Sequence, residues 1–104
     1  MSEHICVQFE IRDMVILRDT LKELGYDFKN ISEEVVEIQR PYHNICINGD
    51  NGTISFDNVN TKEVNKLKQT YQLNYYRDQA IKEGMNMEVT QEANGEIVLN
   101  LLHQ

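Results

Sequence analysis

Two cysteines and three histidines are the residues of this chain best suited to bind a metal or to act as nucleophiles. His4 and Cys6 are two residues apart in an alternating segment, so they would share one face of a strand. Cys46 has an outward position in a second alternating segment, and if the two strands were neighbours the three residues could meet as zinc ligands. Their spacing lacks the paired motif of a zinc site, and a small strand residue is the plainer interpretation of each cysteine. We therefore predict no metal site and no cofactor.

The sequence contains no recognisable arrangement of residues for nucleophilic or acid–base catalysis. Cys6 could pair with His4 or His43, but no acidic residue is placed to orient either histidine. The 17 Asp and Glu residues form no pair in a catalytic context, and neither a Walker A loop nor a G-x-G-x-x-G motif occurs. We predict that the protein is not an enzyme.

Length, composition and charge narrow the class of partner. The chain has 104 residues, 40% of them hydrophobic and 26% charged, which fits one folded domain over residues 1–104. A net charge of −7 disfavours nucleic acid, because Lys and Arg supply most of the affinity for phosphates. No apolar stretch reaches the about 18 residues of a membrane span, and the acidic N-terminus is unlike a signal peptide. These features predict an acidic cytoplasmic protein that binds protein rather than nucleic acid or membrane.

Hydrophobic periodicity predicts the elements of the first half of the chain. Alternation over residues 5–11 predicts a strand, and Asp13 is placed to cap a helix that ends at Gly25. A short strand is predicted over 35–39. A hairpin around the sequence GDNG joins 44–48 to 53–57, with Ile45, Ile47, Ile54 and Phe56 facing the core.

The second half of the chain predicts a long helix followed by a hairpin. Thr61 is a plausible N-cap for a helix that runs to about Gly84, and Asn94-Gly95 is a turn signal between two alternating segments. The resulting order is β-α-β-β-β-α-β-β. It predicts an α+β fold in which two helices pack on one face of a mainly antiparallel sheet of five to six strands.

The predicted second helix carries two apolar stripes in its second half. At 100° per residue, one stripe follows the usual core spacing and consists of Val64, Leu67, Tyr71 and Tyr75. The other stripe lies on the opposite side and consists of Leu73, Tyr76 and Ala80. A helix on a sheet buries only one face fully, so the second stripe needs separate cover.

Three kinds of cover are open for this second stripe: the first helix, another protein surface, or a small ligand. For a protein interface, including self-association into a homo-oligomer, we predict Leu73, Tyr76 and Ala80 at the centre with Gln69 and Arg77 at the rim. A ligand-binding alternative is a nucleotide site.

In the nucleotide alternative, tyrosine rings would stack on the base and nearby polar groups would hold the phosphates. The residues predicted for this role are Tyr71, Asn74, Tyr75 and Arg77.

Three segments together resemble a known family over nearly the whole chain. They are VQFEIRDMVILRDTLKELGY (7–26), NICINGDNGTISF (44–56) and VNKLKQTYQLNYYRDQAIKEGMNMEVTQEANGEIVLNL (64–101). The chain resembles the hypothetical chloroplast reading frame thirty-five family, a domain of unknown function found in plastids, cyanobacteria, bacteria and phages. It departs from that family in having no tryptophan and a shorter segment between the central hairpin and the second helix.

The resemblance implies an accessory role and does not imply a catalytic activity. It carries no catalytic residues, and genes of the family often neighbour genes for AAA-type ATPases, which would make such an ATPase the partner. The phage members suggest an alternative, a small oligomeric protein that sequesters host nucleotides or host defence proteins.

Overall fold

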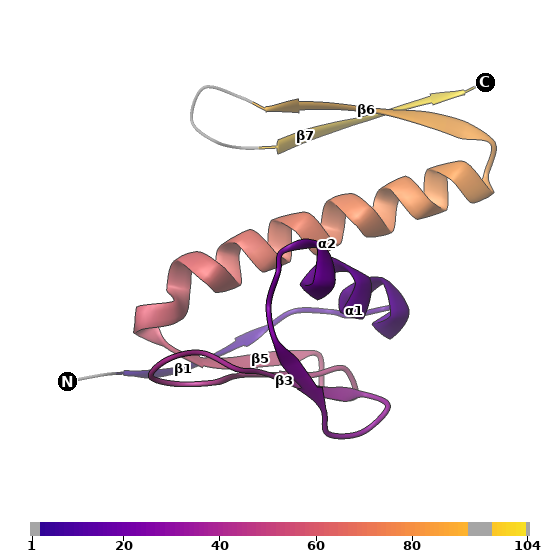
Figure 1. Cartoon of the computed structure of the whole chain (residues 1–104). Coiled ribbons are helices and arrows are strands. Elements are labelled where there is room, and N and C mark those ends of the chain that lie inside the picture. The colour runs from indigo at the N-terminus through magenta and orange to yellow at the C-terminus, as the bar shows by residue number, and fades with distance from the viewer. Residues whose placement is uncertain (1–2, 92–96, 104) are drawn as a thin grey trace.

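The computed structural model describes residues 3–91 and 97–103, with side-chain surroundings for residues 3–84 (Figure 1). The elements in chain order are β1 (His4–Gln8), α1 (Met14–Glu23), β2 (Phe28–Asn30), β3 (Val35–Ile38), β4 (Ile45–Asn48), β5 (Thr53–Asp57), a 3-10 turn (Asn58–Asn60), α2 (Thr61–Lys82), β6 (Met85–Gln91) and β7 (Ile97–His103). The predicted α+β class is confirmed. The strand β2, which is short, polar and half-exposed, was absent from the predicted order.

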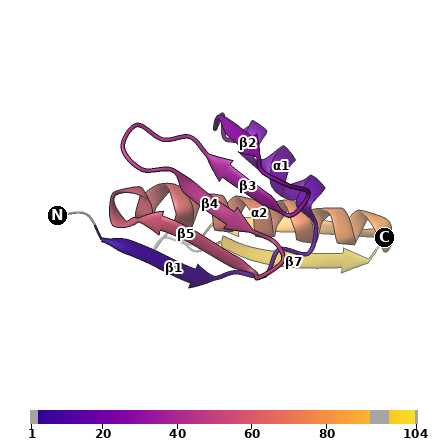
Figure 2. The same cartoon turned by 90° about the horizontal axis from the view of Figure 1, so that it is seen from below.

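Five strands form one antiparallel sheet in the order β1-β5-β4-β3-β2. The strands from β2 to β5 follow one another as a meander, whereas β1 joins at the far edge and pairs only with β5, with Cys6 opposite Ser55. Both helices cover the same face of this sheet, and Figure 2 shows the strands from the opposite side. The sheet therefore has one covered and one open face.

Side chains from the covered face and from both helices form the core. Alternate residues of β3, β4 and β5 are at most 5% exposed: Val36, Ile38, Ile45, Ile47, Ile54 and Phe56. The helices contribute Leu17, Leu21, Val64, Leu67 and Tyr71 to the same cluster. The core positions predicted for the central hairpin are confirmed.

The first helix begins and ends where the sequence predicts. The carboxylate oxygen Oδ1 of Asp13 accepts hydrogen bonds from the backbone N–H groups of Val15 (2.9 Å) and Ile16 (3.1 Å). Gly25 follows the helix with φ of 79°, a conformation that residues with a Cβ rarely adopt.

The predicted N-cap of the second helix is wrong by one residue. Thr61 is the first helical residue, Asn60 precedes it, and the hydroxyl of Thr61 donates back to the carbonyl oxygen of Asn58 at 2.7 Å. The physical reason is the 3-10 turn, because helical winding of the backbone already begins there, three residues before Thr61. Asp57 caps this turn.

The strands β6 and β7 pair with each other in a separate two-stranded sheet, and not with the five-stranded one. Figure 1 shows this hairpin on the side of α2 that faces away from the large sheet. Its predicted turn at Asn94-Gly95 lies outside the described residues. The Cα radius of gyration is 14.7 Å, above the about 13 Å of a compact chain of this length, so the molecule is elongated.

Within the described part of the chain, no helix combines the length and the apolar character needed to cross a membrane.

Candidate binding surface on helix α2

The first helix packs against one flank of α2, and Asn74 marks that flank. The side-chain amide of Asn74 donates to the hydroxyl of Thr20 at 3.0 Å and to the carboxylate of Glu23 at 3.2 Å, both on α1. Thr70, one turn earlier, is buried on the same flank. Cover by α1 therefore falls on the Asn74 flank and does not reach Tyr76.

The predicted binding surface, which contains the second apolar stripe, lies on the side of α2 opposite its core stripe. We call it the outer surface of α2 and define it by Gln69, Leu73, Tyr76, Arg77 and Ala80. Tyr76 is 46% exposed, Leu73 is half-buried, and Gln69 and Arg77 are exposed. Ala80 is only 1% exposed and lies near the end of α2, which β6 contacts as the chain turns back. The apolar stripe is thus closed at the C-terminal end of the helix and open around Tyr76.

Four aromatic rings run from the core to this opening. Phe9 meets the edge of Tyr71 at 5.6 Å between ring centroids, Tyr71 stacks on Tyr75 at 6.1 Å, and Tyr75 meets Tyr76 at 5.6 Å. Aromatic pairs at these separations attract one another beyond simple burial. The exposed ring of Tyr76 is therefore held in place by a chain of rings that ends in the core.

The hydroxyl of Tyr71 fixes the connection between β1 and α1. Its oxygen accepts hydrogen bonds from the backbone N–H groups of Arg12 (3.0 Å) and Asp13 (3.2 Å), just before the first helical turn. The ring is 3% exposed, and burial raises the pKa of the hydroxyl, while the two N–H donors act in the opposite direction. Tyr71 is accordingly a structural member of the aromatic series.

The raised pKa of Tyr71 predicts a loss of stability in alkali. The unfolded chain releases the phenol proton near the ordinary value of about 10, below the pKa in the folded state, so ionisation favours unfolding. The contribution of Tyr71 to the free energy of unfolding is complete below a pH of about 10. It is lost as the pH rises through the pKa of Tyr71 in the folded state. Urea denaturation should give a lower free energy of unfolding at pH 10.5 than at pH 8.

The replacement Tyr71→Phe should reduce this pH dependence without abolishing it. Burial also raises the pKa of Tyr26, so a second phenol contributes with the same sign. A free energy of unfolding that stays constant between pH 8 and pH 11 would contradict the prediction.

A small cavity lies beside the aromatic series. It has a volume of about 110 Å³ and is lined by Phe9, Glu10, Arg12, Tyr71, Gln72, Tyr75 and Tyr76. Pockets for drug-sized ligands measure about 300–1,000 Å³, so this cavity is too small to enclose a nucleotide. The guanidinium of Arg12 is also engaged by the carboxylate of Glu10 at 3.2 Å.

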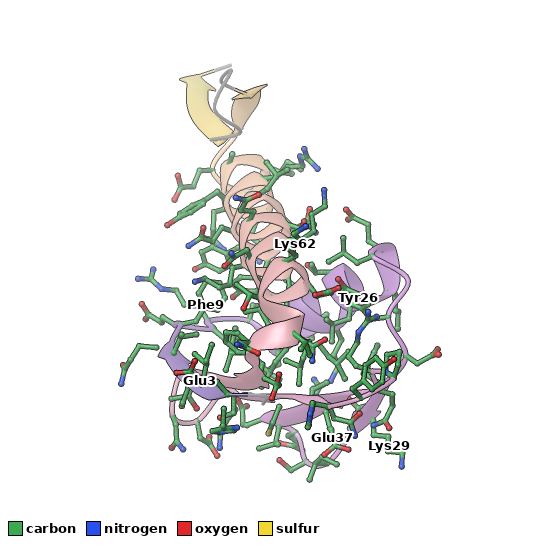
Figure 3. The ribbon with its side chains drawn as sticks, turned by 90° about the vertical axis from the view of Figure 1, so that its left-hand side faces the viewer. Glu3, Phe9, Tyr26, Lys29, Glu37 and Lys62 are labelled. Atoms are coloured by element: carbon green, nitrogen blue, oxygen red, sulfur yellow. The ribbon has the colours of Figure 1, made fainter. Side chains whose placement is uncertain are left out.

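The residues predicted for nucleotide binding do not converge on this cavity. Tyr71 and Tyr75 line it, but Asn74 is bonded to α1, and Arg77 lies on the exposed outer surface and does not line it. Figure 3, which views α2 nearly end-on, shows Phe9 on the flank opposite α1.

A second, more open hollow was not anticipated from the sequence. It has a volume of about 560 Å³ and lies between residues 8–12, which connect β1 to α1, and residues 49–52, the turn between β4 and β5. No signal in the sequence indicated it, because its two walls lie about 40 residues apart along the chain.

The zinc hypothesis for His4, Cys6 and Cys46 is wrong. Strand β5 lies between β1 and β4, so Ser55 separates the two cysteines, and two strand spacings amount to about 9.5 Å. Among residues 3–91 and 97–103, no three His, Cys, Asp or Glu side chains are grouped as metal ligands. Burial, and secondarily the charge of Glu37, raises the pKa of Cys46 and keeps its thiol protonated at neutral pH.

The cysteines belong to a row across the open face of the large sheet. In register, Cys6, Ser55, Cys46, Glu37 and Lys29 stand opposite one another on successive strands. Figure 3 shows Glu37 and Lys29 on the side of the sheet away from α2. The open face is thus polar at its centre, whereas the outer surface of α2 is apolar at its centre, at Leu73 and Tyr76.

Comparison with known proteins gives no relative: no family model, no curated protein and no solved structure matches the chain. The resemblance to the plastid reading-frame family therefore stays a prediction, and the functional argument depends on the surfaces described above.

Proposed function

We propose that the protein is a non-enzymatic cytoplasmic binding protein that associates with a second copy of itself through the outer surface of α2. The observation that supports this proposal is Tyr76, which is 46% exposed beside the half-buried Leu73. It stays exposed although the C-terminal hairpin lies over the side of α2 that faces away from the large sheet. An exposed tyrosine next to aliphatic surface is typical of an interface centre.

Two further features of this surface favour a protein partner over a small ligand. The ring of Tyr76 is already positioned by its contact with Tyr75, so less conformational entropy is lost on binding. The surface around it is convex helix, and the adjacent cavity of about 110 Å³ is small. Gln69 and Arg77 are exposed and would form a polar rim.

The AAA-type ATPase implied by the resemblance remains an alternative partner, as does a host protein sequestered by a phage-type relative. Neither has support from the described contacts. Association with a second copy of the chain can be tested directly on the purified protein.

Replacement of Tyr76 by alanine should weaken self-association about 30-fold or more, because truncation of a central interface tyrosine costs about 2 kcal/mol or more. Sedimentation equilibrium of the wild-type chain and of Tyr76→Ala would measure the two dissociation constants. Urea denaturation of the same variant should show that the fold is retained, since the lost ring is 46% exposed and lies outside the core cluster.

Tyr42→Ala is the matched control for this experiment. Tyr42 is 87% exposed on the connection between β3 and β4, and its replacement removes the same side chain from a position outside the outer surface of α2. A wild-type chain that stays monomeric at millimolar concentration, or equal dissociation constants for Tyr76→Ala and wild type, would overturn the proposed function.

A further inference from the structure

The C-terminal hairpin is a sheet of only two strands. β6 pairs with β7 over seven residues each, from Met85 opposite His103 to Gln91 opposite Ile97, and neither strand pairs with the large sheet. Within residues 3–91 and 97–103, each strand of the hairpin therefore has one unpaired edge. Two-stranded sheets are marginally stable in water, and three or more strands or a packed face are needed for independent stability.

The free edges of the described strands differ in how they are protected against further pairing. At the edges of the large sheet, β2 has only three residues and carries the exposed Lys29, while β1 is flanked by the exposed Glu3 and Glu10. In the hairpin, β6 has Glu88 at its centre. Short length and charged residues are the usual means of preventing edge-to-edge pairing.

The strand β7 lacks all of these protections. Its sequence, IVLNLLH, contains no Lys, Arg, Asp, Glu, Pro or Gly over seven residues. Five of the seven residues are aliphatic, which favours a strand that pairs on both sides. Its free edge is therefore the one, among the described strands, that is best suited to receive another strand.

The edge of β7 and the exposed Tyr76 lie on the same flank of α2. Figures 2 and 3 both show β7 on the flank where β1 lies, with α1 on the other. Tyr76 lines the cavity formed with Phe9, Glu10 and Arg12, which follow β1, and so belongs to that flank. A strand added to β7 would approach the part of α2 that is left open.

We infer that two copies of the protein pair antiparallel through the free edges of β7, which joins the two hairpins into one four-stranded sheet across a two-fold axis. This inference rests on the proposed function and names the element that meets its partner. Antiparallel pairing of a strand with its own copy is compatible with a two-fold axis, which makes the interface the same on both subunits. With the axis at the strand centre, Asn100 faces Asn100 of the other copy.

The β7 edge alone is too small for a stable interface, so the outer surface of α2 must also contribute. A seven-residue edge is about 23 Å long, which by itself buries less than the about 800 Å² per subunit of a stable complex. The hairpin adds apolar residues to this region, because its register sets Met87 opposite Leu101 and Val89 opposite Leu99. The dimer must include the neighbouring Tyr76 surface to reach the usual size.

Asn100→Lys tests the inference with little risk to the hairpin. Asn100 stands opposite Glu88 within the same chain, so the introduced lysine gains an oppositely charged cross-strand partner. Across the proposed two-fold axis, however, two introduced lysines would face each other. Sedimentation equilibrium should show a dissociation constant raised about tenfold or more, with thermal stability of the monomer unchanged or higher.

Thr90→Lys is the matched control, because it adds the same charge to β6, opposite Val98 in the same hairpin. It should leave the dissociation constant within about twofold of wild type. Mixing Asn100→Lys with Asn100→Glu should then restore association, since the pair across the axis becomes oppositely charged. With one of the two variants labelled with 15N, so that their masses differ, native mass spectrometry would detect the heterodimer as the dominant species.

The outcomes separate this inference from the proposed function. A wild-type dimer that Tyr76→Ala weakens but Asn100→Lys leaves unchanged would overturn pairing through β7 and still support self-association by α2. Equal weakening by Thr90→Lys and Asn100→Lys, or a mixture without heterodimers, would also overturn it. A monomeric wild-type chain would overturn both proposals.

Discussion

Leu67→Ala should lower the free energy of unfolding by about 2–5 kcal/mol, which is a large share of the stability of a domain of this size. Leu67 is 1% exposed in the first half of α2, within the cluster that joins both helices to the large sheet. Removal of the Cγ carbon and its two methyl groups there leaves a cavity that neighbouring strands can fill only in part. Urea denaturation monitored by circular dichroism would measure the change.

Leu73→Ala provides the matched comparison for Leu67→Ala. It makes the same substitution six residues further along the same helix, but at a half-buried position on the outer surface of α2. The monomer should lose far less stability, while self-association should weaken. Equal destabilisation by the two replacements would contradict the assignment of Leu67 to the core and Leu73 to the surface.

Tyr71→Ala should cost about 3–5 kcal/mol of folding free energy, because it removes both a buried ring and an anchor for α1. The ring contacts Phe9 and Tyr75, and the hydroxyl accepts the N–H groups of Arg12 and Asp13. Chemical denaturation at pH 7 would measure the loss. A cost below about 1 kcal/mol would show that the residue is peripheral to the core.

The variant Tyr71→Phe separates the two contributions. It keeps the ring but leaves two partly buried backbone donors without their acceptor, which should cost about 1–3 kcal/mol. Hydrogen exchange at the amides of Arg12 and Asp13 should accelerate in the same variant. Tyr42→Phe, at an exposed position, should change neither stability nor exchange.

The sequence was most informative where one face of an element is buried. Alternation predicted the central hairpin because Ile45, Ile47, Ile54 and Phe56 all point into one core, and Asp13 predicted the start of α1 because its side chain caps two N–H groups. It was least informative for β2, whose three residues are too few and too polar to show a period.

The outer surface of α2 illustrates the limit for the candidate site. Helical periodicity separated Tyr71 from Tyr76, and their exposed fractions, 3% and 46%, agree with that separation. What covers the second stripe depends on the direction in which the chain leaves α2, which periodicity does not encode. Ala80 is buried where β6 turns back, and Tyr76 is not.

The position of β1 at the edge of the large sheet has a consequence for the order of folding. Cys6 of β1 pairs with Ser55 of β5, 49 residues later, whereas β3, β4 and β5 pair across short connections. Closing a longer loop costs more entropy, and pairs distant in sequence slow folding. The meander is therefore expected to form first. Strand β1, although it is synthesised first, can pair only after β5 has formed, and it completes the sheet last.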